Sequence, residues 1–186
     1  MRIVGGTFKG RRLQAPEGRD LRPTSDRTRE AVFNILGHGL GVDLDGLAVV
    51  DFFAGTGAMG LEALSRGAAH ATLVDQSSEA NRIARINAGA VGAAQNTTIL
   101  KLDADNLPPP PLISQAPCAV AFFDPPYQSG LARIALISAA TKGWIETGSI
   151  CTVEVAAKED FEAPFGFAVL DERKYGAARV FFLEVA

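Results

Sequence analysis

Apolar runs and amphipathic segments alternate along most of this chain. An apolar run bounded by turn-forming residues predicts a buried strand, and apolar residues three or four positions apart predict a helix. Between two such runs, residues 77–91 carry Ala80, Ile83 and Ala84 on one helical face. Strands that alternate with helices predict an α/β fold with a parallel sheet. The predicted strands begin at Val49 and Ala71 and cover residues 97–102, 119–123 and 148–155.

The two ends of the chain depart from this alternation. Residues 1–14 predict a short hairpin with its turn at a pair of glycines. A helix capped by Thr24 or Ser25 should follow and run to about Leu36, where two further glycines stop it. At the other end, a terminal antiparallel hairpin is predicted from residues 167–170 and 179–185.

Charge is distributed unevenly along the 186 residues. The net charge of −3 does not by itself indicate a nucleic-acid-binding protein. Residues 1–30, however, hold eight basic and four acidic side chains, so this segment is +4 and the remainder is −7. The asymmetry predicts a polyanion-binding arm beside an acidic catalytic body, although a basic terminus without a partner gives the same pattern. We therefore treat residues 1–40 as a basic appendage and residues 41–186 as the catalytic domain.

A strand, a glycine-rich turn and a helix follow one another around residues 49–64, a common cradle for nucleotide-like ligands. The Gly-x-Gly-x-x-Gly motif that begins at Gly55 fits the dinucleotide fingerprint, and Asp75 is suitably spaced to contact a ribose. Asp51, however, ends the strand before the glycines. Its carboxylate would repel a pyrophosphate but could accept hydrogen bonds from an ammonium group. This favours S-adenosylmethionine over NAD and leaves an NAD-binding protein as an alternative.

A second motif, Asp-Pro-Pro-Tyr at residues 124–127, follows another apolar strand. Together, the two motifs resemble those of class I, S-adenosylmethionine-dependent amino-methyltransferases. An exocyclic base amine is a poor nucleophile because its lone pair is delocalised into the ring. The Asp124 carboxylate and the Pro125 carbonyl could accept its hydrogens and aim the lone pair at the methyl group. Tyr127 offers a face on which an extruded base can stack. A rigid turn with no chemical role is the alternative.

The stretch from Leu21 to Leu36 resembles the N-terminal signature of a bacterial family, the 16S rRNA guanine-N2 methyltransferases that modify guanine 966. The segments Arg2–Gly6, Lys9–Leu13 and Lys174–Gly176 fit the same family, so the resemblance spans nearly the whole chain. It implies a class I methyltransferase fold. This is a seven-stranded, mostly parallel sheet with an antiparallel C-terminal hairpin, helices on both faces and a small N-terminal β-hairpin.

The resemblance also implies a reaction and the residues that perform it. The methyl group of S-adenosylmethionine would pass to the N2 amine of a guanine in 16S rRNA or in an assembling small ribosomal subunit. Catalysis is expected from Asp124, Pro125 and Tyr127. Cofactor contacts are expected from Asp51, Phe53, Ala54, Gly55, Gly57, Asp75, Asp103 and Asp124. RNA contacts are expected from Lys9, Arg11, Arg12, Arg22, Arg27, Arg29 and Lys174.

Three further alternatives stay open. The methyl acceptor could be another exocyclic amine of a base, or the chain could be a non-catalytic RNA-binding module that keeps the cofactor site as structure. Methylation at cytosine C5 uses a cysteine after a proline, and Pro117-Cys118 is such a dipeptide. It precedes its strand, however, so its thiol should lie at the wrong edge of the sheet.

The remaining features exclude several classes of protein. Cys118 and Cys151 lie in separate apolar strands and are expected to be reduced core thiols. With only His38 and His70 as histidines, no metal site is expected. No apolar run approaches the roughly 18 residues of a membrane span, and the N-terminus has no signal-peptide pattern. We therefore expect a cytoplasmic protein, and a monomer.

Overall fold

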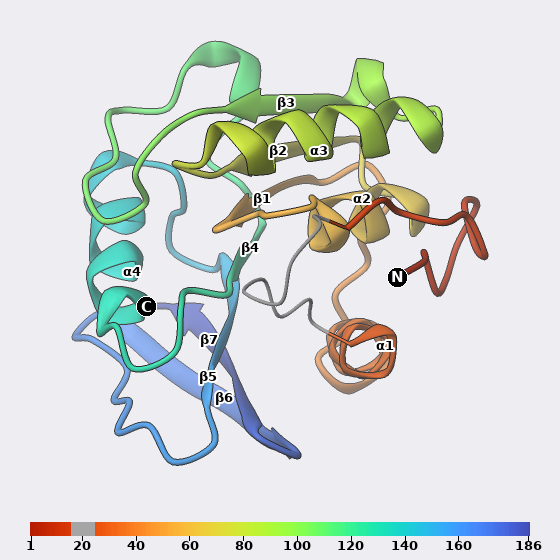
Figure 1. The fold of residues 1–186 in the computed structure, drawn as a ribbon. Helices are drawn as coiled ribbons and strands as arrows, with labels where there is room; N and C mark the ends of the chain where they lie inside the picture. Colours follow the sequence, from red (N-terminus) through yellow and green to blue (C-terminus); the bar gives the residue numbers. More distant parts are fainter. Residues whose placement is uncertain (16–24) are drawn as a thin grey trace.

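The computed structural model describes residues 1–15 and 25–186, and its strands form one mixed sheet (Figure 1). The seven strands lie in the order β3-β2-β1-β4-β5-β7-β6. The first five in this order are parallel, whereas β7 is antiparallel to both β5 and β6. The predicted sheet and its C-terminal hairpin are thus confirmed. The strands are β1 (Ala48–Phe52), β2 (His70–Val74), β3 (Thr97–Leu100), β4 (Val120–Phe123), β5 (Ile150–Ala156), β6 (Phe167–Tyr175) and β7 (Ala178–Val185).

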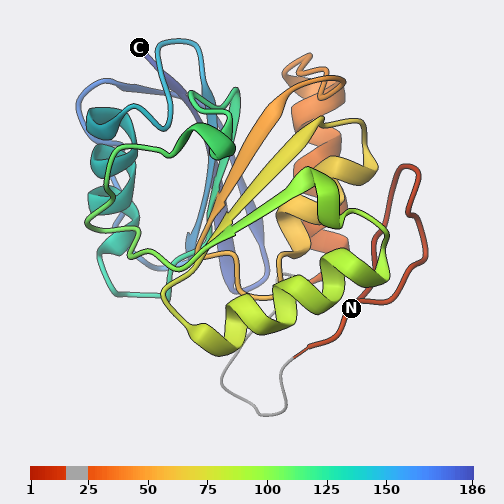
Figure 2. The same cartoon turned by 90° about the horizontal axis from the view of Figure 1, so that it is seen from above.

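Helices cover both faces of the sheet, as predicted. Helix α4 lies on the opposite side of the sheet from α1 and α2 (Figure 2). Short 3₁₀ turns occur at Ala94–Asn96 and Leu112–Ser114. The α-helices are α1 (Asp26–Asn34), α2 (Ala58–Ser65), α3 (Ser78–Ala90) and α4 (Leu131–Lys142).

Alternation along the central strand explains the two apolar layers. In β1, Val49 packs into the cluster that contains α1, α2 and α3, whereas Val50 and Phe52 pack into the cluster under α4. Successive strand residues point to opposite faces, and a strand covered on both faces is apolar at both sets of positions. This is why the apolar runs of the sequence mark the strands so well.

The order of the strands places a crevice at the middle of the sheet. From β1 the chain proceeds outward through β2 and β3, and it then returns to β4 on the other side of β1. In open α/β sheets, ligands bind outside the carboxyl ends of the strands at such a switch in direction. The glycine-rich turn follows β1 and the Asp-Pro-Pro-Tyr motif follows β4, so both motifs meet at this point.

Three local predictions need correction. The arms of residues 1–14 meet in a single antiparallel bridge between Arg2 and Arg12, without regular strands. The glycines after Leu36 do not stop the first helix, because a π-helical turn continues to Gly39. Strand β6 extends well beyond residue 170 and includes a polar, exposed run. An edge strand tolerates such charged residues, which conceal it in the sequence.

The N-terminal segment shares its core with the sheet. Ile3 and Leu13 pack in the same apolar cluster as Val32 and Phe33 of α1 and Leu61 of α2. The cap of α1 is the predicted one, since the side chain of Ser25 accepts a hydrogen bond from a backbone N–H in the first turn. In the described part of the chain, no helix has both the length and the apolar character to cross a membrane.

Candidate active site

A cavity of about 430 Å³ opens at the carboxyl ends of the central strands. It lies where the switch in strand order predicts a ligand site. The glycine loop, the end of β2, the segment after β3 and the Asp-Pro-Pro-Tyr loop all contribute to its wall. The lining residues are Phe53, Gly55, Val74, Asp75, Gln76, Ser77, Leu102, Asp103, Ala104, Asp124, Pro125, Pro126, Tyr127 and Glu154.

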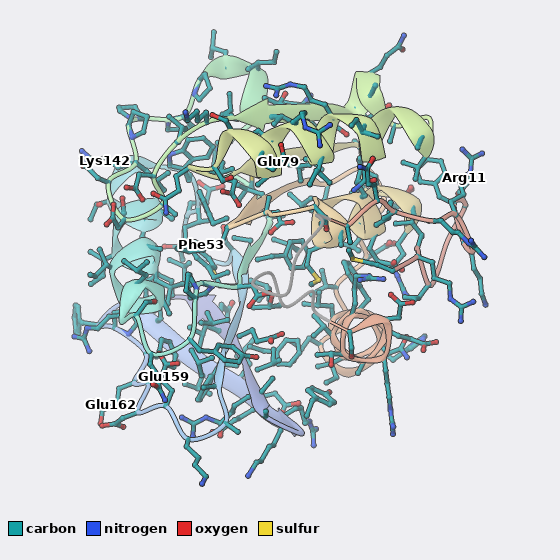
Figure 3. The ribbon with its side chains drawn as sticks, viewed as in Figure 1. Arg11, Phe53, Glu79, Lys142, Glu159 and Glu162 are labelled. Carbon is teal, nitrogen blue, oxygen red and sulfur yellow. The ribbon has the colours of Figure 1, made fainter. Side chains whose placement is uncertain are left out.

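The loop after β1 is held close to β2 by its glycines. Gly57 has a φ of 80°, and a Cβ there would lie 2.7 Å from Cδ1 of Leu73. A Cβ on Gly60 would lie 2.3 Å from Cδ2 of the same leucine, so neither glycine can be replaced unless the buried side chain of Leu73 moves. Phe53 adopts a left-handed φ of 64°, which is rare for a bulky residue and typical of functional sites. Its position is labelled in Figure 3.

Asp75 joins the glycine loop to the start of α3. Its Oδ2 accepts a hydrogen bond from the N–H of Gly55 at 2.8 Å, and its Oδ1 accepts one from the N–H of Ser77 at 2.8 Å. A carboxylate has about four acceptor sites, so two backbone donors still leave capacity for ligand hydroxyls. The same bonds fix the carboxylate at the cavity wall.

Asp51, another predicted cofactor residue, does not line the cavity and is 2% exposed. Its Oδ2 accepts a hydrogen bond from the N–H of Gly60 at 3.2 Å. Burial raises the pKa of Asp51 to about 8, and the negative charges of Asp124 and Asp75 add to this increase against the lowering effect of the Gly60 N–H. A cation at the site would reverse the charge contribution and favour the ionised carboxylate.

The other predicted cofactor residues divide into two groups. Asp103 and Gly55 both line the cavity; Asp103 is exposed and Gly55 is half-buried. Ala54 and Gly57 are buried and do not line it, although the N–H of Ala54 donates to the carbonyl of Val74 at 2.9 Å and so anchors the loop.

The Asp-Pro-Pro-Tyr loop is fixed from β5 and from the segment that follows it. The hydroxyl of Tyr127 donates to Oε1 of Glu154 at 2.7 Å. The N–H of Gln128, which has a φ of 59°, donates to Oε2 of Glu159 at 2.8 Å. Pro125 is buried, whereas Asp124 and Tyr127 are half-buried and line the cavity. The three predicted catalytic residues therefore lie together on one anchored loop.

Comparisons with known proteins agree with this architecture. The family described as "Conserved hypothetical protein 95" matches residues 1–184. Ribosomal RNA small subunit methyltransferase D of Escherichia coli strain K12 is 36% identical over 156 residues, which cover 83% of this chain and 74% of that protein. This chain belongs to the same family as that methyltransferase. The resemblance seen in the sequence is thereby confirmed.

Solved structures give the same picture of the family fold. The structure titled "Putative methyltransferase yhhF", from Escherichia coli, superposes with a TM-score of 0.81 at 29% identity and covers 100% of this chain and 97% of that one. An RNA methyltransferase of Salinibacter ruber, solved with S-adenosyl-L-homocysteine, has a TM-score of 0.65 at 14% identity and covers 88% and 94%. The fold is that of the class I methyltransferases.

The residues expected to contact RNA do not all lie on the surface. Lys9, Arg11, Arg12, Arg27 and Lys174 are exposed. Arg22 lies outside the described residues.

Arg29 is 0% exposed, and its guanidinium bonds to Asp26 at 2.9 Å and to Glu62 at 3.4 Å. It also donates to the backbone carbonyl of Arg2. A guanidinium so enclosed cannot reach a phosphate in this structure, and we remove Arg29 from the expected RNA surface.

Sequence reasoning missed Glu154. This residue lies within apolar β5 and belongs to no recognisable motif, yet it lines the cavity and contacts Tyr127. A usable signal was its place in the chain, because a charged residue near the carboxyl end of a buried parallel strand points to the ligand edge of the sheet.

The cysteine alternative receives no support from the geometry. Cys118 precedes β4, is fully buried and does not line the cavity, and burial raises the pKa of its thiol to about 12. A thiol in such surroundings is a poor nucleophile. No group of three or more metal-ligating side chains occurs among residues 1–15 and 25–186.

Proposed function

We propose that this protein transfers a methyl group from S-adenosylmethionine to the N2 amine of a guanine in 16S rRNA, guanine 966 by family resemblance. The observation that carries the proposal is the shared cavity. It joins the glycine loop and Asp75 to the Asp-Pro-Pro-Tyr loop in a chain whose relatives are named small-subunit rRNA methyltransferases.

The residues present suit S-adenosylmethionine. A cavity of about 430 Å³ falls within the range of about 300–1,000 Å³ for small-molecule sites. Asp75 would accept the ribose hydroxyls, Asp103 the adenine amine, and buried Asp51 would answer the positive charge of the amino acid part. Gly55 faces open space, because a Cβ there would meet only the carbonyl of Phe53, at 3.9 Å. When bound, the cofactor would supply an electrophilic methyl group.

The loop after β4 would prepare the amine. The Asp124 carboxylate and the Pro125 carbonyl accept hydrogen bonds from its two hydrogens, which aims the nitrogen lone pair into the cavity. These bonds strengthen as positive charge develops on the nitrogen, so they stabilise the transition state more than the ground state. The methylated nitrogen is acidic, and its extra proton passes to Asp124. The Tyr127 ring holds the base by stacking.

Transfer of a labelled methyl group tests the proposal. Tritiated S-adenosylmethionine is incubated with the protein and with 16S rRNA from cells that lack its gene, both as free RNA and as small ribosomal subunits. We expect label in one N2-methylguanine, located by mass spectrometry of nuclease fragments. Label on an adenine or cytosine amine would favour the broader amino-methyltransferase. RNA binding without transfer would favour the non-catalytic module.

A further inference from the structure

Two carboxyl groups lie side by side at the edge of the cavity. The parallel register of β4 and β5 pairs Phe123 with Val153, so the following positions bring Asp124 beside Glu154. Neighbouring strands are about 4.8 Å apart, and paired residues point to the same face. Both carboxyl groups line the main cavity, and both also line a small apolar pocket that adjoins it.

Glu154 is held in place by the catalytic loop. The hydroxyl of Tyr127 donates to its Oε1 at 2.7 Å, and the residue is half-buried between apolar Val153 and Val155. An ionised carboxylate only accepts hydrogen bonds, and it accepts several at once. This hydrogen bond therefore links the carboxylate of Glu154 to the tyrosine ring that would stack on the base.

Only one base amine has a second donor beside it on the same edge. In guanine, the N2 amine adjoins the N1–H, so both groups donate. In adenine and cytosine, the exocyclic amine adjoins an unprotonated ring nitrogen, which accepts. Two adjacent carboxylates complement the guanine edge, whereas with adenine or cytosine one carboxylate would face a lone pair. Buried acceptors left without a donor disfavour the wrong ligand strongly.

We propose that Glu154 selects guanine by accepting a hydrogen bond from its N1–H while Asp124 accepts one from the N2 amine. This inference rests on the proposed function and adds a residue that reads the base. It makes Glu154 a specificity-determining residue and gives the bond from Tyr127 the role of fixing the direction of its carboxylate.

The test replaces the target guanine of semi-synthetic 16S rRNA with 2-aminopurine. This base keeps the amine at C2 but has no hydrogen on N1. For the wild-type protein we expect kcat/KM to be about ten- to a hundredfold higher with guanine than with 2-aminopurine. Glu154→Gln keeps the shape and can donate to the bare N1, so the preference should shrink by about tenfold or more.

Three controls separate the outcomes. Glu162→Gln makes the same change on an exposed carboxyl group beyond the site, and it should leave the preference unaltered. Tyr127→Phe keeps the ring that stacks on the base but removes the bond to Oε1 of Glu154, so it should reduce the preference for guanine less than Glu154→Gln does, with little loss of rate on 2-aminopurine. Melting temperature and cofactor affinity verify that Glu154→Gln is folded. If Glu154→Gln slows both bases equally and keeps the preference, Glu154 only positions Tyr127 and the inference is wrong. If the wild-type protein does not methylate guanine at all, it is the proposed function that fails.

Discussion

The buried carboxyl group of α2 and the carboxyl groups around the cavity differ in what surrounds them. On α2, the fully buried carboxylate of Glu62 accepts hydrogen bonds from the backbone N–H groups of Val4 at 2.9 Å and Gly5 at 2.8 Å. It also pairs with Arg66 at 2.8 Å and with Arg29 at 3.4 Å. All of these partners come from the protein itself, so this carboxylate joins the N-terminal segment and α1 to α2.

At the ligand edge of the sheet, the carboxyl groups of Asp75, Asp124 and Glu154 instead face an open cavity. Backbone N–H groups hold Asp75, and the hydroxyl of Tyr127 holds Glu154, at the wall of this cavity. The difference teaches that charge alone does not identify a binding residue. Arg29 and Glu62 are polar residues of the core, whereas Asp75, Asp124 and Glu154 line a cavity.

The comparison predicts the largest stability loss for Glu62→Ala. The substitution leaves the buried guanidinium of Arg29 without its partner on α2, a change that costs about 3–5 kcal/mol in buried ion pairs. Urea unfolding measures it. The control is Glu79→Ala, which removes a carboxylate paired with Arg82 on the exposed face of α3 and should leave the unfolding midpoint unchanged. Equal midpoints for the two variants would show that the Glu62 cluster does not hold the N-terminal segment.

The next largest effect should be on catalysis. We expect Asp124→Ala to slow single-turnover methyl transfer by about 100–1000-fold, since it removes an acceptor that acts as charge develops, as with oxyanion donors. The melting temperature should hardly change, in contrast to Glu62→Ala. Full single-turnover activity in Asp124→Ala would reduce the Asp-Pro-Pro-Tyr loop to a structural turn.

Asp75→Ala should weaken S-adenosylmethionine binding by about tenfold or more, because charge-assisted hydrogen bonds contribute about 1.5–3 kcal/mol. Calorimetry measures the affinity. Asp75→Asn tests whether the weaker binding comes only from a displaced glycine loop. Its amide oxygen can still accept a hydrogen bond from the N–H of Gly55 and so keep the loop in place. Unchanged affinity in both variants would remove Asp75 from the cofactor site.

The sequence predicted the sheet well because buried parallel strands are apolar on both faces. Strand β4 was predicted at residues 119–123 and is Val120–Phe123, and helix 77–91 is Ser78–Ala90. The edge strand β6 was predicted too short because its polar half is exposed and has no apolar pattern. A local pattern reports burial, so it succeeds where burial is complete.

Residues of the cavity wall were predictable where a motif carries them. Asp75 and Asp124 end strands next to recognisable turns, and both line the cavity. Arg29 was misassigned because its burial depends on Glu62, which lies 33 positions away. Glu154 was missed because only the pairing of β5 with β4 brings it beside Asp124. Such long-range contacts leave no mark on a short stretch of sequence.

Cofactor affinity should rise with pH through Asp51. Burial raises the pKa of Asp51 to about 8, which favours the protonated carboxyl group near pH 7 in the free protein, whereas a bound cation would favour ionisation. Binding should then release a proton, and affinity should increase by up to about tenfold per pH unit between pH 6 and 8. Calorimetry in buffers of different ionisation enthalpy measures the release.

Asp51→Asn is the control for that pH dependence and should flatten it. Cofactor affinity should rise with pH, whereas the contribution of Asp51 to the free energy of unfolding should fall with pH. Between about pH 4 and 8 the folded protein holds a proton on Asp51 that the unfolded chain has lost, so this residue lowers stability as the pH rises. A melting temperature whose pH dependence is the same in Asp51→Asn would contradict the assignment.

The smallest effect is expected far from the cavity. Nη1 of Arg11 donates to the carbonyl of Ala90 at 3.3 Å, at the end of α3, whereas Asp75 lies just before its start. A helix of 13 residues is about 20 Å long. Arg11 and Phe53 accordingly lie on different sides of the molecule in Figure 3. An RNA that reaches both must span this distance.

Replacing Arg11 and Arg12 together with glutamine should therefore act on RNA alone. If both arginines contact phosphates, the plot of log affinity against log salt concentration should become less steep, by about 1.4–1.8 in slope. Cofactor affinity should not change. The matched control replaces Arg133 and Lys142, two exposed cations of α4 on the other face of the sheet, with glutamine. A slope that falls equally in both double variants would mean that RNA responds to net charge. Only a loss confined to Arg11 and Arg12 would make the N-terminal segment an RNA surface, because the two double variants have the same total charge.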